Sequence, residues 1–149
     1  MNSLAAERVM HELAITRLFD APRARVFNAF VDSRQMMQWL GPHGYTMTYL
    51  KADVRVGGVW RGCMRSVTDG RELWHGGVYR EIVPVERLAF TFAFDLGPET
   101  LVAIDFEDRG AKTLMRFRQG AFGTSQDAEG HRGGWESEFN RLAALVARH

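Results

Sequence analysis

The residues whose types and spacing could do chemistry are His75, Tyr79 and Glu81, which alternate with other residues in one strand-like run. Every second side chain of a strand points to the same face, so these three share a face with Gly77. If that face lines an apolar cavity, the loss of water raises the pKa of Glu81 unless an arginine pairs with it. A carboxyl, a phenol and an imidazole in such a cavity could serve as general acids or bases.

The opposite orientation of the same strand has a different consequence. If Trp74, Val78 and Ile82 face the interior, the three polar side chains lie on the solvated outer face and catalyse nothing. Alternation alone does not choose between the two orientations, so both stay open at this point.

Composition and motifs exclude several other classes of function. The chain has 149 residues, which suits one domain, and a net charge of +1, which offers no electrostatic argument for binding nucleic acid. Cys63 is the one cysteine, so we predict a buried structural thiol rather than a disulfide or a thiolate cluster. The five histidines are scattered without a metal-binding spacing, and we expect neither a metal nor a cofactor. Because no apolar run reaches membrane-spanning length, we expect a soluble, cytoplasmic protein.

The longest predicted element is a C-terminal helix from about Asp127 to Ala147, with Thr124 as a candidate N-cap. Its apolar stripe has the 3.6-residue period of a helix and consists of Ala128, His131, Trp135, Phe139, Leu142 and Val146. A sheet with one apolar face must cover this stripe, because nothing else in the chain is long enough to do so.

The elements before this helix are predicted from alternation and from glycine and proline breakers. A first strand at 12–19 is followed by two short helices, one after Pro22 and one from Ser33 to Leu40. Six further strands are expected at 51–56, 59–67, 73–83, 88–95, 100–107 and 113–119. Short turns between them favour an antiparallel meander, hence an α+β protein.

The chain resembles the START-like (SRPBCC, birch-pollen-allergen-like) superfamily, in the branch similar to the activator of heat-shock protein 90 ATPase. The motifs that carry the resemblance are Phe19-Asp20-Ala21-Pro22, Trp39-Leu40-Gly41-Pro42, Gly57-Gly58-Val59-Trp60, the run from Gly77 to Leu88, Phe90-Thr91 and Gly134-Trp135. The resemblance implies a helix-grip fold, in which a curved antiparallel sheet of six or seven strands wraps the C-terminal helix. It implies a single domain over residues 1–149, with a less ordered segment at 1–11.

The resemblance also implies a cavity between the sheet and the helix. The family pattern favours an inward orientation for Tyr79 and Glu81. We expect Gly62, which lies between the bulky Trp60 and Met64, to leave room for a ligand. The residues expected to contact a ligand are Trp39, Trp60, Gly62, Met64, Tyr79, Phe90, Phe92, His131, Trp135 and Phe139.

Three functions are compatible with these expectations. The favoured one is binding of a small hydrophobic or aromatic molecule in the cavity, without catalysis. The first alternative is a cyclase- or hydrolase-type enzyme that uses Glu81, Tyr79 or His75. The second is a co-chaperone that stimulates a heat-shock protein 90 type ATPase, and a homodimer is also compatible with the sequence.

Overall fold

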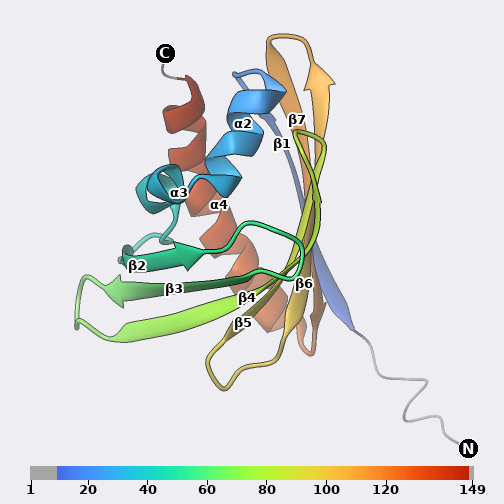
Figure 1. Cartoon of the computed structure of the whole chain (residues 1–149). Helices are drawn as coiled ribbons and strands as arrows, with labels where there is room; N and C mark the ends of the chain where they lie inside the picture. Colours follow the sequence, from blue (N-terminus) through green and yellow to red (C-terminus); the bar gives the residue numbers. More distant parts are fainter. Residues whose placement is uncertain (1–9, 148–149) are drawn as a thin grey trace, which may run out of the picture.

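The structure is a computed structural model, and it describes residues 10–147 (Figure 1). The elements follow the predicted order: β1 (His11–Phe19), α2 (Arg23–Val31), α3 (Ser33–Trp39), β2 (Tyr45–Ala52), β3 (Val59–Ser66), β4 (Glu72–Val83), β5 (Arg87–Phe94), β6 (Thr100–Arg109), β7 (Lys112–Phe122) and α4 (Ser125–Ala147). Most of the segment 1–11, expected to be less ordered, lies outside the described residues; His11 is the first residue of β1. Within residues 10–147, no helix is both long and apolar enough to cross a membrane.

The strands form one antiparallel sheet in the order β1-β7-β6-β5-β4-β3-β2. Helices α2 and α3 carry the chain from β1, at one edge, to β2, at the other. The sheet curves around α4, which crosses its concave side together with the two short helices (Figure 1). The α+β helix-grip fold expected from the sequence is therefore confirmed.

One strand was predicted in the wrong place. The run 51–56 alternates like a strand, but β2 ends at Ala52 and the chain then turns. In that turn the N–H of Asp53 donates to the carbonyl of Val59, and Gly57 adopts φ +85°, which favours glycine. Val54 and Val56 are consequently exposed rather than packed on one face.

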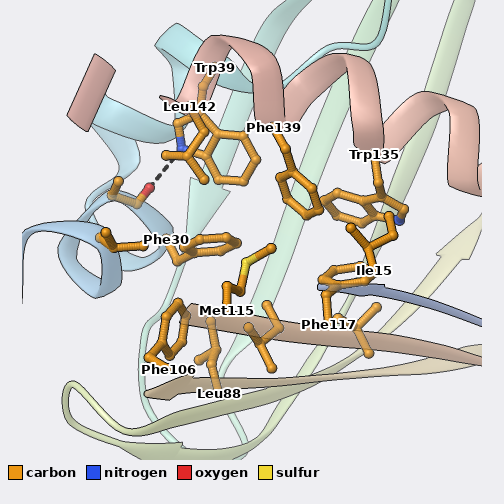
Figure 2. Close-up of a cluster of buried hydrophobic side chains, with 14 of the residues drawn as sticks. Ile15, Phe30, Trp39, Leu88, Phe106, Met115, Phe117, Trp135, Phe139 and Leu142 are labelled. Carbon is orange, nitrogen blue, oxygen red and sulfur yellow. Dashed lines mark hydrogen bonds between the residues drawn. The ribbon is translucent and has the colours of Figure 1, made fainter. Parts of the chain in front are cut away.

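The helix α4 begins two residues earlier than predicted, and Thr124 precedes it as its N-cap. The Thr124 Oγ1 accepts a hydrogen bond of 3.0 Å from the N–H of Asp127, which satisfies one of the free donors of the first turn. Toward the C-terminal end of α4, Phe139 and Leu142 are completely buried in the main hydrophobic core (Figure 2). The predicted stripe thus packs against the sheet.

The two halves of the sheet lie at different distances from α4. The helix contacts β1, β7, α2 and α3 closely, but among the described residues it makes at most a weak backbone contact with β2, β3, β4 or β5. In Figure 1 the strands β2, β3 and β4 cross the line of α4. Side chains alone must fill the space under this half of α4, and this is where a cavity lies.

Candidate functional site

A cavity of about 240 Å³ lies between α4 and the concave face of β3, β4 and β5. The helix α3 borders the cavity at Met36, and the loop that follows it does so at Leu40 and Pro42. Its wall is almost entirely apolar. Nine of the residues singled out from the sequence lie along it: Trp39, Trp60, Met64, His75, Tyr79, Phe90, Phe92, His131 and Trp135.

The orientation of β4, which alternation left open, depends on a β-bulge. Tyr79 pairs with Phe90, but Glu81 pairs with Ala89. A step of two residues along β4 is therefore matched by a step of only one residue along β5. The extra residue reverses the alternation between these positions. His75 and Tyr79 face the interior, with Tyr79 only 2% exposed, whereas Glu81 turns to the outer face.

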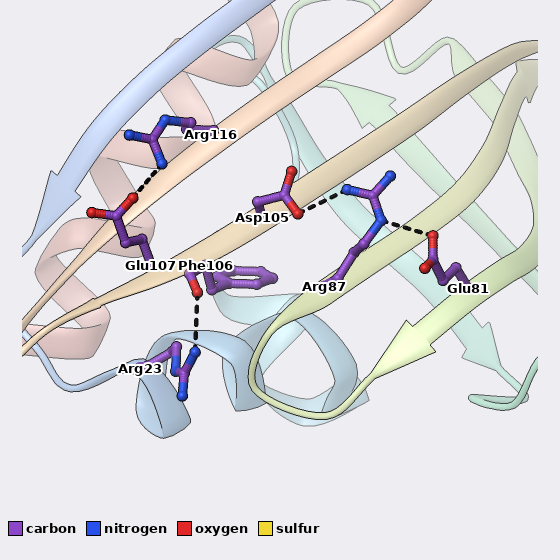
Figure 3. A network of polar contacts seen from close by, with 7 residues as sticks. All are labelled: Arg23, Glu81, Arg87, Asp105, Phe106, Glu107 and Arg116. Atoms are coloured by element: carbon purple, nitrogen blue, oxygen red, sulfur yellow. Dashed lines mark hydrogen bonds and ion pairs between the residues drawn. The ribbon is translucent and has the colours of Figure 1, made fainter.

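The inward orientation expected for Glu81 is therefore wrong. Its Oε1 accepts a 2.7 Å hydrogen bond from Nε of Arg87, whose guanidinium also donates to Asp105 Oδ1 at 2.8 Å (Figure 3). The side chain of Glu81 is 45% exposed in this ion pair. The bulge could not be read from residue types, because it is a property of the pairing between two strands.

Gly62 and Phe139 are the two expected ligand contacts that do not line the cavity. A Cβ atom at Gly62 would lie 3.0 Å from Nε2 of His75 and 3.1 Å from Cε of Met47, so these side chains already fill the space above the glycine. The room for a ligand expected at Gly62 is thus absent. Phe139 is completely buried behind the cavity, with its ring stacked on Trp135 at 5.7 Å between centroids.

The indole N–H groups of the three cavity tryptophans are bonded within the protein. Trp39 donates to the carbonyl of Ala29 at 2.8 Å, and Trp60 donates to the carbonyl of Thr91 at 3.2 Å. Trp135 donates to a side chain, Oε1 of Gln119, at 2.8 Å. The polar edge of each ring is therefore already satisfied, and the apolar ring surface remains for the cavity.

A buried hydrogen-bond chain fixes Trp135 in this position. Gln119, which has no exposed surface, accepts from Trp135 and donates through Nε2 to Oγ1 of Thr100 at 2.9 Å. Thr100 in turn donates to the carbonyl of Phe92 at 3.0 Å. The chain links α4 to β7, β6 and β5, so the helix and the far wall of the cavity are held in register.

The ring of Phe92 occupies the centre of the wall. It stacks on His75 at 5.5 Å between ring centroids and lies edge-on to His131 at 5.7 Å and to Trp135 at 6.1 Å. Trp60 covers its remaining side at 5.6 Å. Rings packed in this way form a largely preformed aromatic surface.

Glu138 lines the cavity and was missed by sequence reasoning. Its carboxyl is buried, and Oε2 accepts a 2.6 Å hydrogen bond from the N–H of Gly41, in the loop after α3. Gly41 has φ +98°, a conformation that glycine adopts readily, so the turn aims this N–H at the helix. One signal was present: Glu138 lies three residues after Trp135 and four before Leu142, on the apolar stripe.

The polar groups of the cavity are uncharged near neutral pH. Burial raises the pKa of Glu138 to about 8, against the opposing influence of the Gly41 N–H. Burial also raises the pKa of Tyr79 to about 12 and lowers the pKa values of His75 and His131 below their usual value. The site therefore suits an uncharged molecule. Within residues 10–147, no cluster of three or more His, Cys, Asp or Glu side chains is placed to hold a metal ion.

Comparison with solved structures shows the same fold in several bacterial proteins. Protein CV1439 from Chromobacterium violaceum superposes with a TM-score of 0.87 at 29% identity, over 93% of this chain and 99% of the other. Protein SPO3351 from Silicibacter pomeroyi superposes with a TM-score of 0.80 at 24% identity, over 92% and 98%. CalU16 from Micromonospora echinospora reaches 0.70 at 21% identity, over 93% and 77%.

One protein-family model matches nearly the whole described chain, whereas no curated protein matches it significantly. Residues 20–147 match the family described as activator of Hsp90 ATPase homolog 1-like proteins. The matched range runs from the residue after β1 to the last residue of α4, so it includes both halves of the sheet and every wall of the cavity. The chain belongs to the family of activator of Hsp90 ATPase homolog 1-like proteins.

Proposed function

We propose that this protein binds a small, uncharged, largely aromatic molecule in the cavity between α4 and strands β3–β5. The observation that carries the proposal is the wall itself, where tryptophan and phenylalanine rings present apolar surface around about 240 Å³ of space. An apolar protein cavity of about 150 Å³ is large enough to bind benzene. The volume here suits a molecule of one or two fused rings.

The stability cost of the cavity supports the same conclusion. An unfilled apolar cavity destabilises a protein, because its lining atoms lose contacts that a packed interior would supply. Here the lining includes Gly130 and Gly134 on α4, at positions where a larger side chain could have reduced the space. A ligand that fills the cavity would offset this loss.

The three residues named for catalysis do not favour an enzyme over binding without turnover. Of the three residues named for catalysis, Glu81 lies on the outer face, in an ion pair with Arg87. Tyr79 has a pKa of about 12, far from the range in which general acid–base catalysis is efficient near neutrality. His75 is stacked on Phe92, and its Nδ1 is hydrogen-bonded with the carbonyl of Leu73 at 3.2 Å. The family description names activation of an ATPase, and we favour ligand binding because of the cavity.

The test compares two glycines of α4 that differ in their relation to the cavity. Gly130 lines it and Gly133 does not, and a Cβ atom at either one would meet no other atom within 4 Å. Leucine is a better helix former than glycine by roughly 0.5–1 kcal/mol, so neither change should unfold the protein. We expect Gly130→Leu to weaken binding of indane or naphthalene at least roughly tenfold, and Gly133→Leu to leave it unchanged.

Tryptophan fluorescence provides the measurement. Three of the four tryptophans line the cavity, whereas Trp74 lies on the outer face beneath the guanidinium of Arg61. Titration in a Trp74→Phe background therefore reports mainly on the cavity. Equal affinities for the two leucine variants, or no binding of either probe by the parent protein, would contradict the proposal.

A further inference from the structure

The carboxyl group of Glu138 offers a polar contact to whatever occupies the cavity. Its Oε2 is held by the N–H of Gly41. The other oxygen, Oε1, has no hydrogen bond among the described residues, yet no fully buried polar side-chain atom there lacks a partner. Oε1 is therefore reachable from the cavity that Glu138 lines.

The arrangement at Gly41 distinguishes the two oxygens. A backbone N–H can only donate, so Oε2 acts as an acceptor and serves as the carbonyl oxygen of a neutral carboxylic acid. The proton of the neutral acid then sits on Oε1, the oxygen that has no partner among the described residues. The loop is braced a second time, because the N–H of His43 donates to Oγ of Ser137 at 3.0 Å, which keeps the carboxyl and the Gly41 N–H together.

The groups around the carboxyl leave it neutral near pH 7. Arg141, one turn later on α4, favours the ionised form, but burial dominates and raises the pKa of Glu138 to about 8. Across the cavity His75 and His131 are uncharged near neutral pH because burial lowers their pKa values, and Tyr79 is uncharged because its pKa is raised. Apart from Glu138 itself, these three are the titratable side chains among the residues that line the cavity, and His43 lies in the adjoining loop.

We propose that Glu138, as a neutral acid, donates a hydrogen bond from Oε1 to the ligand, and that the natural ligand is accordingly an aromatic molecule with an uncharged acceptor such as a ketone carbonyl. This inference rests on the proposed binding function and specifies its ligand class. An apolar cavity penalises a buried donor that has no partner, so an acceptor on the ligand offsets that cost. A plain hydrocarbon of the same shape leaves the donor unpartnered.

A charged ligand is less well matched to the same site. A ligand carboxylate would bring a second acidic group next to Glu138 in an environment that disfavours charge. A protonated amine would require Glu138 to ionise inside an apolar wall, and both charges would lose their water. The neutral donor–acceptor pair avoids both costs.

The experiment uses a matched pair of probes, indane and 1-indanone, which differ by one carbonyl. At pH 7 we expect the parent protein to prefer 1-indanone by about three- to tenfold, the range of one net hydrogen bond. At pH 9.5 the preference should disappear, because Glu138 is ionised there and no longer donates. His75, His131 and Tyr79 keep their charge state across this range, since their shifted pKa values lie outside it.

Two variants separate the hydrogen bond from the shape of the side chain. Glu138→Gln retains an oxygen to accept from Gly41 and gains an amide donor for the ligand. It should therefore keep the preference for 1-indanone at both pH values. Glu138→Met has no donor and should bind the two probes equally at both. Near-UV circular dichroism checks folding, and if a variant does not fold, the comparison of the parent protein at pH 7 and pH 9.5 decides alone.

The outcomes distinguish failure of this inference from failure of the proposed function. Equal affinity of the parent protein for indane and 1-indanone at both pH values overturns the inference and leaves ligand binding standing. A preference for protonated 1-aminoindane that is lost in Glu138→Gln overturns it in favour of a cationic ligand. If neither indane nor 1-indanone binds to the parent protein, both proposals fail.

Discussion

The two ends of the interior beneath α4 are built from similar residues but differ in how they are filled. At the closed end, Phe27 from α2 packs edge-on against Phe106 at 5.5 Å, and Leu142 on α4 is completely buried. At the cavity end, Trp135 on α4 and the rings of β4 and β5 border a space that no side chain fills. The difference is α2, which fills the gap between helix and sheet at one end only.

The incompletely packed end of the interior also carries the titratable side chains. The titratable side chains on the cavity wall are His75, Tyr79, His131 and Glu138. At the closed end, by contrast, Phe27, Phe106 and Leu142 carry only hydrocarbon side chains and are buried. A buried polar group is costly unless it has a partner, and the cavity leaves room for a ligand to supply one. The comparison therefore predicts that substitutions at the two ends affect different properties.

The largest effect should follow truncation at the closed end. Phe139→Ala removes a completely buried ring and should lower the free energy of unfolding by about 3–5 kcal/mol. Phe94→Ala, on the cavity wall, should cost under about 2 kcal/mol, because this ring is only partly buried and already borders empty space. Urea denaturation measures both values. Equal losses would show that the cavity end is packed as tightly as the closed end.

The second effect is a dependence of stability on pH that originates at Glu138. Its pKa is about 8 in the folded protein and about 4.5 in the unfolded chain. Between pH 4.5 and pH 8 the folded chain therefore binds more protons than the unfolded chain. The stabilisation is complete below pH 4.5 and is lost as the pH rises through 8. The contribution is on the order of 3–5 kcal/mol.

The measurement is the unfolding free energy of the parent protein minus that of Glu138→Gln, at pH 5 and at pH 8.5. Subtraction removes the opposite effect of His75 and His131, whose lowered pKa values destabilise the folded state as the pH falls. A difference that does not change with pH would mean that the carboxyl is not buried at the cavity wall.

A third substitution tests whether any part of the cavity extends over Gly62. Leucine there would collide with the ring of His75 and the end of Met47, so Gly62→Leu should destabilise the protein by about 1–3 kcal/mol through overpacking. Thermal unfolding measured beside Gly130→Leu provides the comparison, since that position is open. Unchanged stability with weaker probe binding would restore the earlier expectation that Gly62 leaves room for a ligand.

The smallest effect should come from the outer face. Glu81→Gln removes one partner of a half-exposed ion pair, and such pairs contribute about 0–1 kcal/mol. Probe affinity should be unchanged, because the bulge holds Glu81 away from the cavity. A loss of binding comparable to that of Gly130→Leu would show that the outer face of β4 communicates with the site.

Most of the fold could be predicted because its signals are local. The helical period of the α4 stripe, the alternation of the strands and the glycine and proline breakers each act within a few residues, and they predicted the order of the elements. The run 51–56 failed because its alternation was genuine but the chain there forms a turn, stabilised by the hydrogen bond between Asp53 and Val59. Half of the residues that line the cavity were likewise among the expected ones, since large aromatic side chains on inner faces are conspicuous in the sequence.

The sequence by itself determined which elements form and which of their faces are apolar, because these depend on the types and spacing of neighbouring residues. Only the tertiary structure decided that a bulge separates Tyr79 from Glu81, that His75 fills the space over Gly62, and that Gly41 meets Glu138. Each of these contacts joins residues far apart in the chain or on different strands. Their geometry depends on strand register and on the distance between sheet and helix, and neither quantity is encoded within a single segment.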